Sequence, residues 1–340
     1  MSAPSRHVFR SDSARLTGAV ILALVCAVAP PRARAQAQQA ESRSSGLEVI
    51  QIRPTVYAIF GAGANIVVQV GPDGAIVVDS GTTEKADAVV AAIKRLTSQP
   101  IRIIFNTSVD ADHVGGNETL AKAGLAYNEN TVFTGGSSAD IVAREEVLLR
   151  MSAPTGERAR FATPLWPTET FTQNTKSLYA NGEGIQAVHQ PAAHSDGDSI
   201  VIFRRADVVA VGDIVDLRHF PFIDRASGGS IQGELDALNR LVTLAIPAMP
   251  LVWQDDRTVV VPGHGRLMDQ AEVVEYRDMV TIIRDNIRHL MDKRMTLEQI
   301  KAANPTAGYR KQYGSDTGAW TTDMFVEAIY RDLLKPAKKP

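Results

Sequence analysis

The sequence predicts an α/β protein, and three observations point to that class. Short apolar runs rich in β-branched residues recur along the chain, as in 101–105 and 259–261. Segments with the apolar spacing of an amphipathic helix lie between several of these runs, as in 86–96. Polar residues and glycines follow abruptly where a run ends, as in 106–117. Because α/β proteins keep their chemistry at such strand ends, we expect a functional site around 106–117.

The first 35 residues predict a secretory signal peptide rather than part of the fold. Three arginines precede an apolar run over residues 16–29, and Ala33 and Ala35 supply small residues before a cleavage point. The run is too short for a comfortable membrane span, although an uncleaved membrane anchor is the alternative. Residues 36–46 are rich in Gln, Ala and Ser and predict a disordered leader. Cleavage would make the mature protein periplasmic or secreted, without membrane attachment.

The composition restricts partners and metal ligands. With 340 residues and 44% hydrophobic content, the chain can bury one large core with an appendage. Removing residues 1–35 takes away five arginines and one aspartate, so the formal charge changes from -2 to -6. A mildly acidic chain without a basic run is not expected to bind nucleic acid. The single cysteine, Cys26, lies in the predicted signal peptide, so His and carboxylate side chains must hold any metal in the mature protein.

The amino-terminal half predicts antiparallel strands followed by alternating helices and strands. Turn residues separate three apolar runs: 56–60, 65–70 and 75–78. Thr82 or Thr83 would cap a helix that ends near Leu96. Further elements are predicted in this order: a strand at 101–105, a helix from Asn117, a strand at 131–133 and a helix at 138–151. Phe161, Trp166 and Phe171 then either line the apolar wall of a cleft or anchor their segment onto the core.

The carboxyl-terminal half predicts a second set of strands. Two strands at 199–204 and 207–211 are separated by a turn at Arg205 and Ala206. The remaining predicted elements are a helix at 231–244 after a Gly-Gly-Ser cap, a strand at 259–261, and helices within 273–291 and 325–334. We interpret the last helices as structural support outside the sheets.

The segment 106–117 contains three side chains that can bind a metal: Asp110, Asp112 and His113. Two acids beside a histidine make electrostatic sense if a cation lies between them. In isolation the same residues are better explained as a solvated acidic loop. The later motifs in the chain favour the metal site.

The whole pattern resembles the metallo-β-lactamase superfamily, whose metal loop reads H-x-H-x-D-H. In that family a lone histidine, a strand-end aspartate and a Pro-Gly-His follow the loop. Here the corresponding residues are His194, Asp213 and His264, and the segment 75–81 resembles the family's early strand that ends in Asp and Gly. The resemblance implies an αββα sandwich of two mixed β-sheets flanked by helices over residues 47–291. A helical C-terminal extension would occupy 292–340.

The metal loop departs from the family pattern, because Ser108 and Asp110 stand where the two leading histidines are expected. The resemblance implies a complete second metal site, made by Asp112, His113, Asp213 and His264. The first site would consist of Ser108, Asp110, His194 and the shared Asp213. A serine hydroxyl is a poor zinc ligand, whereas Asp110 is a sound one. We therefore expect one firmly bound zinc and a second, weaker one, with iron or manganese as alternatives.

The resemblance implies a metal-dependent hydrolase that acts on a small molecule. Bound zinc lowers the pKa of its water to about 7, and Asp112 or Asp110 would orient that water or accept its proton. The bond attacked would be an ester, lactone, thioester or β-lactam, with little β-lactam turnover expected. Two alternatives remain open. Ser108 and Asp110 favour a non-catalytic, metal-containing binding protein, whereas the carboxylate-rich ligand set favours an iron-dependent oxidoreductase. No feature of the sequence predicts an oligomeric state.

Overall fold

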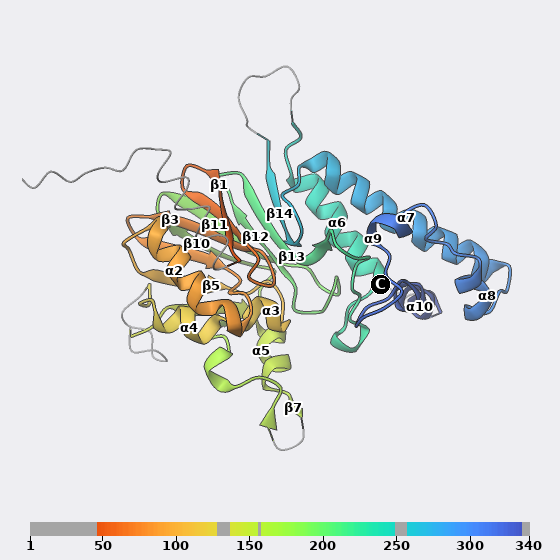
Figure 1. The fold of residues 1–340 in the computed structure, drawn as a ribbon, viewed down its shortest axis with the longest axis horizontal. Helices are drawn as coiled ribbons and strands as arrows, with labels where there is room; N and C mark the ends of the chain where they lie inside the picture. The colour runs from red at the N-terminus through yellow and green to blue at the C-terminus, as the bar shows by residue number, and fades with distance from the viewer. Residues whose placement is uncertain (1–45, 128–136, 156–157, 249–256, 335–340) are drawn as a thin grey trace, which may run out of the picture. The chain divides into compact units, whose positions relative to one another are not determined.

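The computed structural model describes residues 46–127, 137–155, 158–248 and 257–334. These residues belong to a single compact unit (Figure 1). The predicted signal peptide, nearly all of the predicted leader and the predicted strand at 131–133 lie outside the described residues. Within the described ranges, no helix has the length and apolar character needed to cross a membrane.

The first sheet is mixed and has seven strands in the order β1-β2-β3-β4-β5-β6-β9. Strands β1 to β4 form an antiparallel meander, which confirms the prediction from the three apolar runs and their turns. Strands β4, β5, β6 and β9 are parallel. The bounds are β1 (Glu48–Arg53), β2 (Val56–Phe60), β3 (Ile66–Gly71), β4 (Gly74–Val78), β5 (Ile101–Phe105), β6 (Asp140–Arg144) and β9 (Glu169–Phe171).

The second sheet has five strands in the order β10-β11-β12-β13-β14. Its first four strands pair antiparallel with their neighbours, and β14 pairs in parallel with β13. The bounds are β10 (Thr175–Ala180), β11 (Glu183–His189), β12 (Ser199–Phe203), β13 (Val208–Asp216) and β14 (Val259–His264). A separate two-stranded ribbon pairs β7 (Pro154–Thr155) with β8 (Arg158–Ala159).

Most of the helices follow the predicted amphipathic segments, but the short helices at 111–114, 297–302 and 310–313 were not predicted. Helix α6 begins after Ser230, whose side-chain oxygen accepts a hydrogen bond from the backbone N–H of Gly233 as an N-cap. The α-helices are α2 (Ala86–Leu96), α3 (Ala111–Val114), α4 (Asn117–Lys122), α5 (Glu145–Ser152), α6 (Ile231–Leu244), α7 (Gln270–Asp292), α8 (Leu297–Ala302), α9 (Arg310–Tyr313) and α10 (Thr322–Leu333).

Three apolar layers hold the sheets and helices together. Between the sheets, Phe105 of the first sheet belongs to the same buried cluster as Phe203 of the second. Helices α2 and α4 pack on the other face of the first sheet through residues such as Ile93. Helices α6, α7, α8 and α10 cover the second sheet, with Tyr276 and Phe325 fully buried there. The predicted αββα sandwich is therefore confirmed, and helices α8 to α10 lie after α7 as the predicted helical C-terminal part (Figure 1).

The predicted helix at 138–151 is wrong in its first half. Residues 140–144 instead form β6, which pairs in parallel with β5, and all five of its residues are buried. A strand buried on both faces has no alternation of polar and apolar residues, so its pattern is easily mistaken for a helix. Helix α5 begins only at Glu145.

The three aromatic residues of the segment after α5 anchor it to the core. Phe171 is buried between the sheets. Phe161 and Trp166 pack against a small apolar cluster that includes Val147 and Met151. Of the two interpretations of these aromatics, core anchoring is the one that the structure supports.

Candidate metal centre

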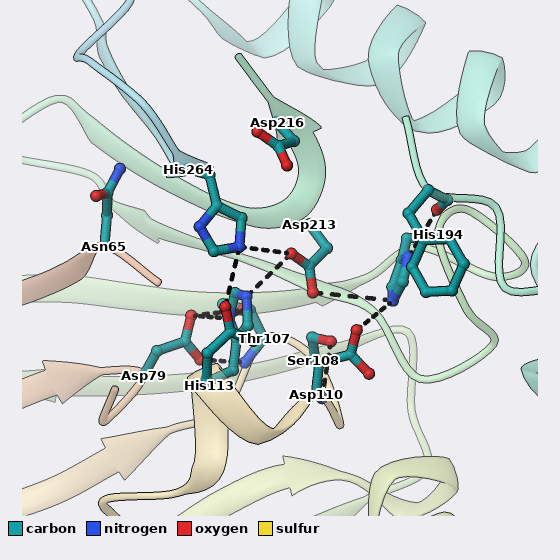
Figure 2. A network of polar contacts seen from close by, with 12 residues as sticks. Asn65, Asp79, Thr107, Ser108, Asp110, His113, His194, Asp213, Asp216 and His264 are labelled. Carbon is teal, nitrogen blue, oxygen red and sulfur yellow. Dashed lines mark hydrogen bonds and ion pairs between the residues drawn. The ribbon is translucent and has the colours of Figure 1, made fainter. Parts of the chain in front are cut away.

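Four segments that are far apart in the sequence place their polar side chains at one end of the two sheets (Figure 2). The loop after β5 and the short helix α3 supply Ser108, Asp110, Asp112 and His113. The loop before β12 supplies His194. Strands β13 and β14 supply Asp213 and His264, respectively. The structure therefore brings together every residue that was predicted to bind a metal.

His113 is fully buried, and a network from the first sheet sets its orientation. Its Nδ1 lies 2.8 Å from Oδ2 of Asp79, at the end of β4. The same carboxylate accepts hydrogen bonds from the backbone N–H of Thr107 at 2.8 Å and from the Thr107 hydroxyl at 2.6 Å. With Nδ1 donating to Asp79, Nε2 points at Asp213 Oδ1, 3.0 Å away.

His194 is also buried, and its orientation follows from one contact with the main chain. Its Nδ1 lies 2.7 Å from the carbonyl oxygen of Phe222. Because a carbonyl can only accept, Nδ1 is the donor, and Nε2 is left with its lone pair toward the site. That nitrogen is 3.3 Å from Asp110 Oδ2 and 3.8 Å from Asp213 Oδ2.

His264 completes the arrangement from the end of β14. Its Nε2 lies 3.2 Å from Asp112 Oδ2 and 3.5 Å from Asp213 Oδ1. Asn65 secures the turn around it by donating side-chain hydrogen bonds to the carbonyl oxygens of Pro262 and Gly265. The Nε2 atoms of all three histidines thus face Asp213, at distances from 3.0 to 3.8 Å.

The potential ligands fall into two clusters, each with its donor atoms within 4.8 Å of one another. The second-site cluster contains Asp112, His113 and His264, and the first-site cluster contains Asp110, His194 and Asp213. The two oxygens of Asp213 face different histidines, since Oδ1 is closest to His113 and Oδ2 faces His194. The Oγ of Ser108 accepts a hydrogen bond from the backbone N–H of Asp110.

The electrostatics of the clusters suit a cation. Burial disfavours a charged His113, but the carboxylates of Asp213 and Asp79 outweigh it and raise the His113 pKa well above 6.5. Burial likewise opposes the charged form of Asp213, yet His113 and the other histidines hold the Asp213 pKa well below 3.8. Without a metal, protons must therefore supply the positive charge that these carboxylates need.

Two buried atoms test whether a metal fits. His194 Nε2 and Asp213 Oδ2 are buried and have no hydrogen-bond partner in the described part of the chain. An unsatisfied buried polar group costs about 1–3 kcal/mol, and a metal ion between these two atoms would satisfy both. Imidazole nitrogen with carboxylate oxygen is a donor set that suits zinc, iron and manganese. The residues therefore fit a divalent metal.

An open cavity of about 390 Å³ lies beside the clusters. One side presents carboxylates and His264, and another presents aromatic rings. The residues that line the cavity include Asp110, Asp112, Asp213, His264, Phe222 and Trp320. The lining does not include Phe161, Trp166 or Phe171. The aromatic side of the cavity is therefore made by other residues than the aromatic segment predicted from the sequence.

Three residues of this site were not among the predicted site residues: Asp79, Phe222 and Trp320. Asp79 was noted only as part of a family-like strand end, although its positive φ of 62° marks an unusual backbone position beside the site. Phe222 lies in the loop after β13 and shows no motif. Trp320 lies between α9 and α10, in a region interpreted only as structural support. Phe222 and Trp320 are recognised as site residues only from their contacts in the folded structure.

Two sheets packed face to face, with candidate metal ligands at their strand ends, point to one superfamily of metal-binding proteins. The comparison with protein families confirms that superfamily. The family model described as "Metallo-beta-lactamase superfamily" matches residues 59–264, which is more than half of the chain. The protein therefore belongs to the metallo-β-lactamase superfamily.

The particular relatives include alkylsulfatases. The chain is 26% identical over 303 aligned residues to "Linear primary-alkylsulfatase" of Pseudomonas sp. (strain ATCC 19151), an alignment that covers 77% of this chain and 54% of the relative. The chain thus spans about half the length of that curated relative. The protein is therefore related to hydrolases of this superfamily, and its two ligand clusters are candidate metal sites.

Solved structures show the same fold. A metallo-β-lactamase from Pontibacter korlensis matches with a TM-score of 0.51 and 18% identity, covering 69% of this chain and 99% of the other. The stereoselective inverting sec-alkylsulfatase Pisa1 from Pseudomonas sp. matches with a TM-score of 0.58 and 15% identity, covering 87% of this chain and 52% of the other. At these identities the likeness concerns the fold alone.

Proposed function

We propose that this protein is a metal-dependent hydrolase that cleaves an ester bond of a small molecule. The observation that carries this proposal is the pair of ligand clusters that border one open cavity, with Asp213 of the first cluster also facing the histidines of the second. A sulfate ester is one class to test, because an alkylsulfatase is among the relatives. Lactones and thioesters are further candidates, and β-lactams are expected to be poor substrates because Ser108 and Asp110 replace the two leading histidines.

The side chains divide the work of hydrolysis. A bound divalent metal supplies a nucleophilic water near neutral pH and polarises the group under attack. Asp112, His113, Asp213 and His264 would hold one zinc firmly, and Asp110 with His194 and Asp213 would hold a second more weakly. Asp112 and Asp110 both line the cavity, where a carboxylate oxygen can orient the attacking water or accept its proton. Asp79 keeps His113 Nε2 directed at the cluster.

Metal dependence and histidine replacement test the proposal together. The purified protein is stripped with a chelator and reloaded with zinc, manganese or iron, then assayed on p-nitrophenyl acetate, p-nitrophenyl sulfate, a lactone, a thioester and a cephalosporin. We expect metal-dependent cleavage of an ester, lost in His264→Ala. The control is His289→Ala, because His289 is an exposed histidine of α7 outside the cavity. Absence of turnover on every substrate, despite bound metal, would overturn the proposal.

A non-catalytic binding protein is the second candidate, and the position of Ser108 favours it. Ser108 is buried, accepts a hydrogen bond from the backbone N–H of Asp110 and stands where a histidine ligand is expected. In that case chelation would lower the melting temperature without affecting any hydrolytic rate. An iron-dependent oxidoreductase is distinguished by its metal, since the protein would then be isolated coloured and with iron bound.

The location of the protein is also a proposal. We infer export to the periplasm or the medium from the signal-peptide pattern in residues 1–35. Mass spectrometry of the exported protein should find an N-terminus near residue 36, and a full-length membrane-bound product would contradict export with cleavage.

A further inference from the structure

The cavity beside the ligand clusters has an apolar side that hydrolysis alone does not explain. Part of it comes from the loop after β13, which contributes Phe220 and Phe222. The rest comes from residues 317–320, in the loop between α9 and α10. The predicted C-terminal extension therefore reaches the candidate active site.

Phe222 and Trp320 form a continuous aromatic surface that begins at a candidate ligand. The ring of Phe222 lies 5.1 Å from the ring of His194, centroid to centroid. The ring of Trp320 meets Phe222 edge to face at 4.7 Å and 67°. Phe222 remains 39% exposed, whereas aromatic side chains of the apolar layers, such as Phe203 and Phe325, are fully buried. When an apolar group covers an exposed aromatic ring beside a cavity, both surfaces leave water and the bound state is stabilised.

The loop that carries Trp320 is anchored at both ends, so its ring has a defined place. The indole N–H of Trp320 donates to the carbonyl oxygen of Phe220 at 3.1 Å. Ser315 and Thr322 close the loop. The backbone N–H of Ser315 donates to the hydroxyl oxygen of Thr322, and the backbone N–H of Thr322 donates to the carbonyl oxygen of Ser315. The backbone N–H of Phe220 also donates to the carbonyl oxygen of Tyr313. The C-terminal segment and the loop after β13 thus form one fixed unit at the cavity.

We propose that Phe222 and Trp320 bind an apolar group of the substrate, an alkyl chain or an aromatic ring, while its ester group lies at the ligand clusters. This inference rests on the proposed function for the position of the ester. It assigns the C-terminal segment a role in selecting the substrate. Charged or small hydrophilic esters would leave the aromatic surface in water and gain nothing from it.

Variants of Trp320 test this role against a matched control. Trp320→Ala removes the ring, and Trp320→Phe keeps an aromatic surface without the indole N–H. Trp166→Ala is the control, because Trp166 is also half-buried and donates its indole N–H to a carbonyl oxygen, that of Phe161, but does not line the cavity. Melting temperatures of all variants identify any that fail to fold.

The first readout is the ratio of kcat/KM for p-nitrophenyl octanoate over p-nitrophenyl acetate. We expect the parent to prefer the octanoate by on the order of 10-fold or more, through KM. Trp320→Ala should abolish the preference, whereas Trp320→Phe and Trp166→Ala should keep it. Equal ratios in the parent and in a folded Trp320→Ala would overturn the inference.

The second readout separates this inference from the proposed function. Binding of octanoate and of acetate to the metal-loaded protein is measured by calorimetry, which needs no turnover. Tighter octanoate binding that depends on Trp320 supports the aromatic surface even if no ester is hydrolysed. Octanoate binding that is no tighter than acetate binding, in a protein that does hydrolyse esters, overturns the surface and leaves the hydrolase standing.

Discussion

Replacing Asp79 by Asn isolates the support that this carboxylate gives to the metal centre. Asp79 is 2% exposed and accepts three hydrogen bonds, two from Thr107 and one from His113. Its φ of 62° lies in the left-handed region, where Asn is well tolerated, so the substitution adds no backbone strain. What changes is the charge opposite His113 and the acceptor that directs its Nε2.

The expected effect of Asp79→Asn is twofold. Loss of a hydrogen-bond partner of a metal-binding histidine lowers metal affinity about 10- to 100-fold. Loss of a charged, buried hydrogen bond lowers the free energy of unfolding of the metal-free protein by about 1.5–3 kcal/mol. Competition with a chromophoric zinc chelator measures the first quantity, and urea unfolding measures the second.

The control for Asp79→Asn is Asp87→Asn, because Asp87 is exposed on the first turn of α2 and takes no part in the site. Both variants lose one negative charge, so a general effect of charge on zinc binding would appear in both. If Asp79→Asn bound zinc as tightly as the parent, Asp79 would not be positioning His113, and the derivation of the His113 orientation would be refuted.

Three further predictions concern the backbone, the altered loop and a buried acid. Gly212→Ala should lower the free energy of unfolding by about 1–2 kcal/mol or more, measured in urea, because φ is +53° and a Cβ would lie 2.3 Å from Thr107 Oγ1. The double replacement Ser108→His with Asp110→His should raise zinc bound after dialysis from about one to about two equivalents, and unchanged stoichiometry would contradict our account of the first-site cluster. Burial raises the pKa of Glu234 well above 4.5, so its contribution to stability is complete below pH 4.5 and is lost as pH rises through the folded-state pKa. Glu234→Gln should therefore flatten the decline of melting temperature with rising pH, and a parallel decline in both proteins would refute this.

Local pattern was enough to predict most of the elements. Helix α6 has the predicted bounds because Ser230 caps it and its apolar residues recur with helical spacing. Strands β2, β3 and β4 were found because turn residues separate them. Strand β6 was not, since both of its faces are buried and its sequence lacks alternation.

The candidate ligands were also accessible from the sequence. Asp110, Asp112 and His113 are neighbours, and His194, Asp213 and His264 each lie in a motif that resembles one of the superfamily's. The grouping of these residues around two sites came from the family resemblance. The structure places Asp112, His113 and His264 in one cluster and Asp110, His194 and Asp213 in the other. Whether they bind metal and catalyse hydrolysis stays a prediction for the experiments above.

The sequence by itself determined the class of fold, many of its helices and strands, and the residues that can act as ligands. Periodicity, caps and strand ends are properties of neighbouring residues, so they can be recognised without coordinates. Only the tertiary structure decided that Asp79 orients His113, which lies 34 residues away, and that Trp320 lies against a loop 100 residues away. Such contacts depend on how the sheets and helices pack, and no local pattern encodes a distance between segments that meet only after folding.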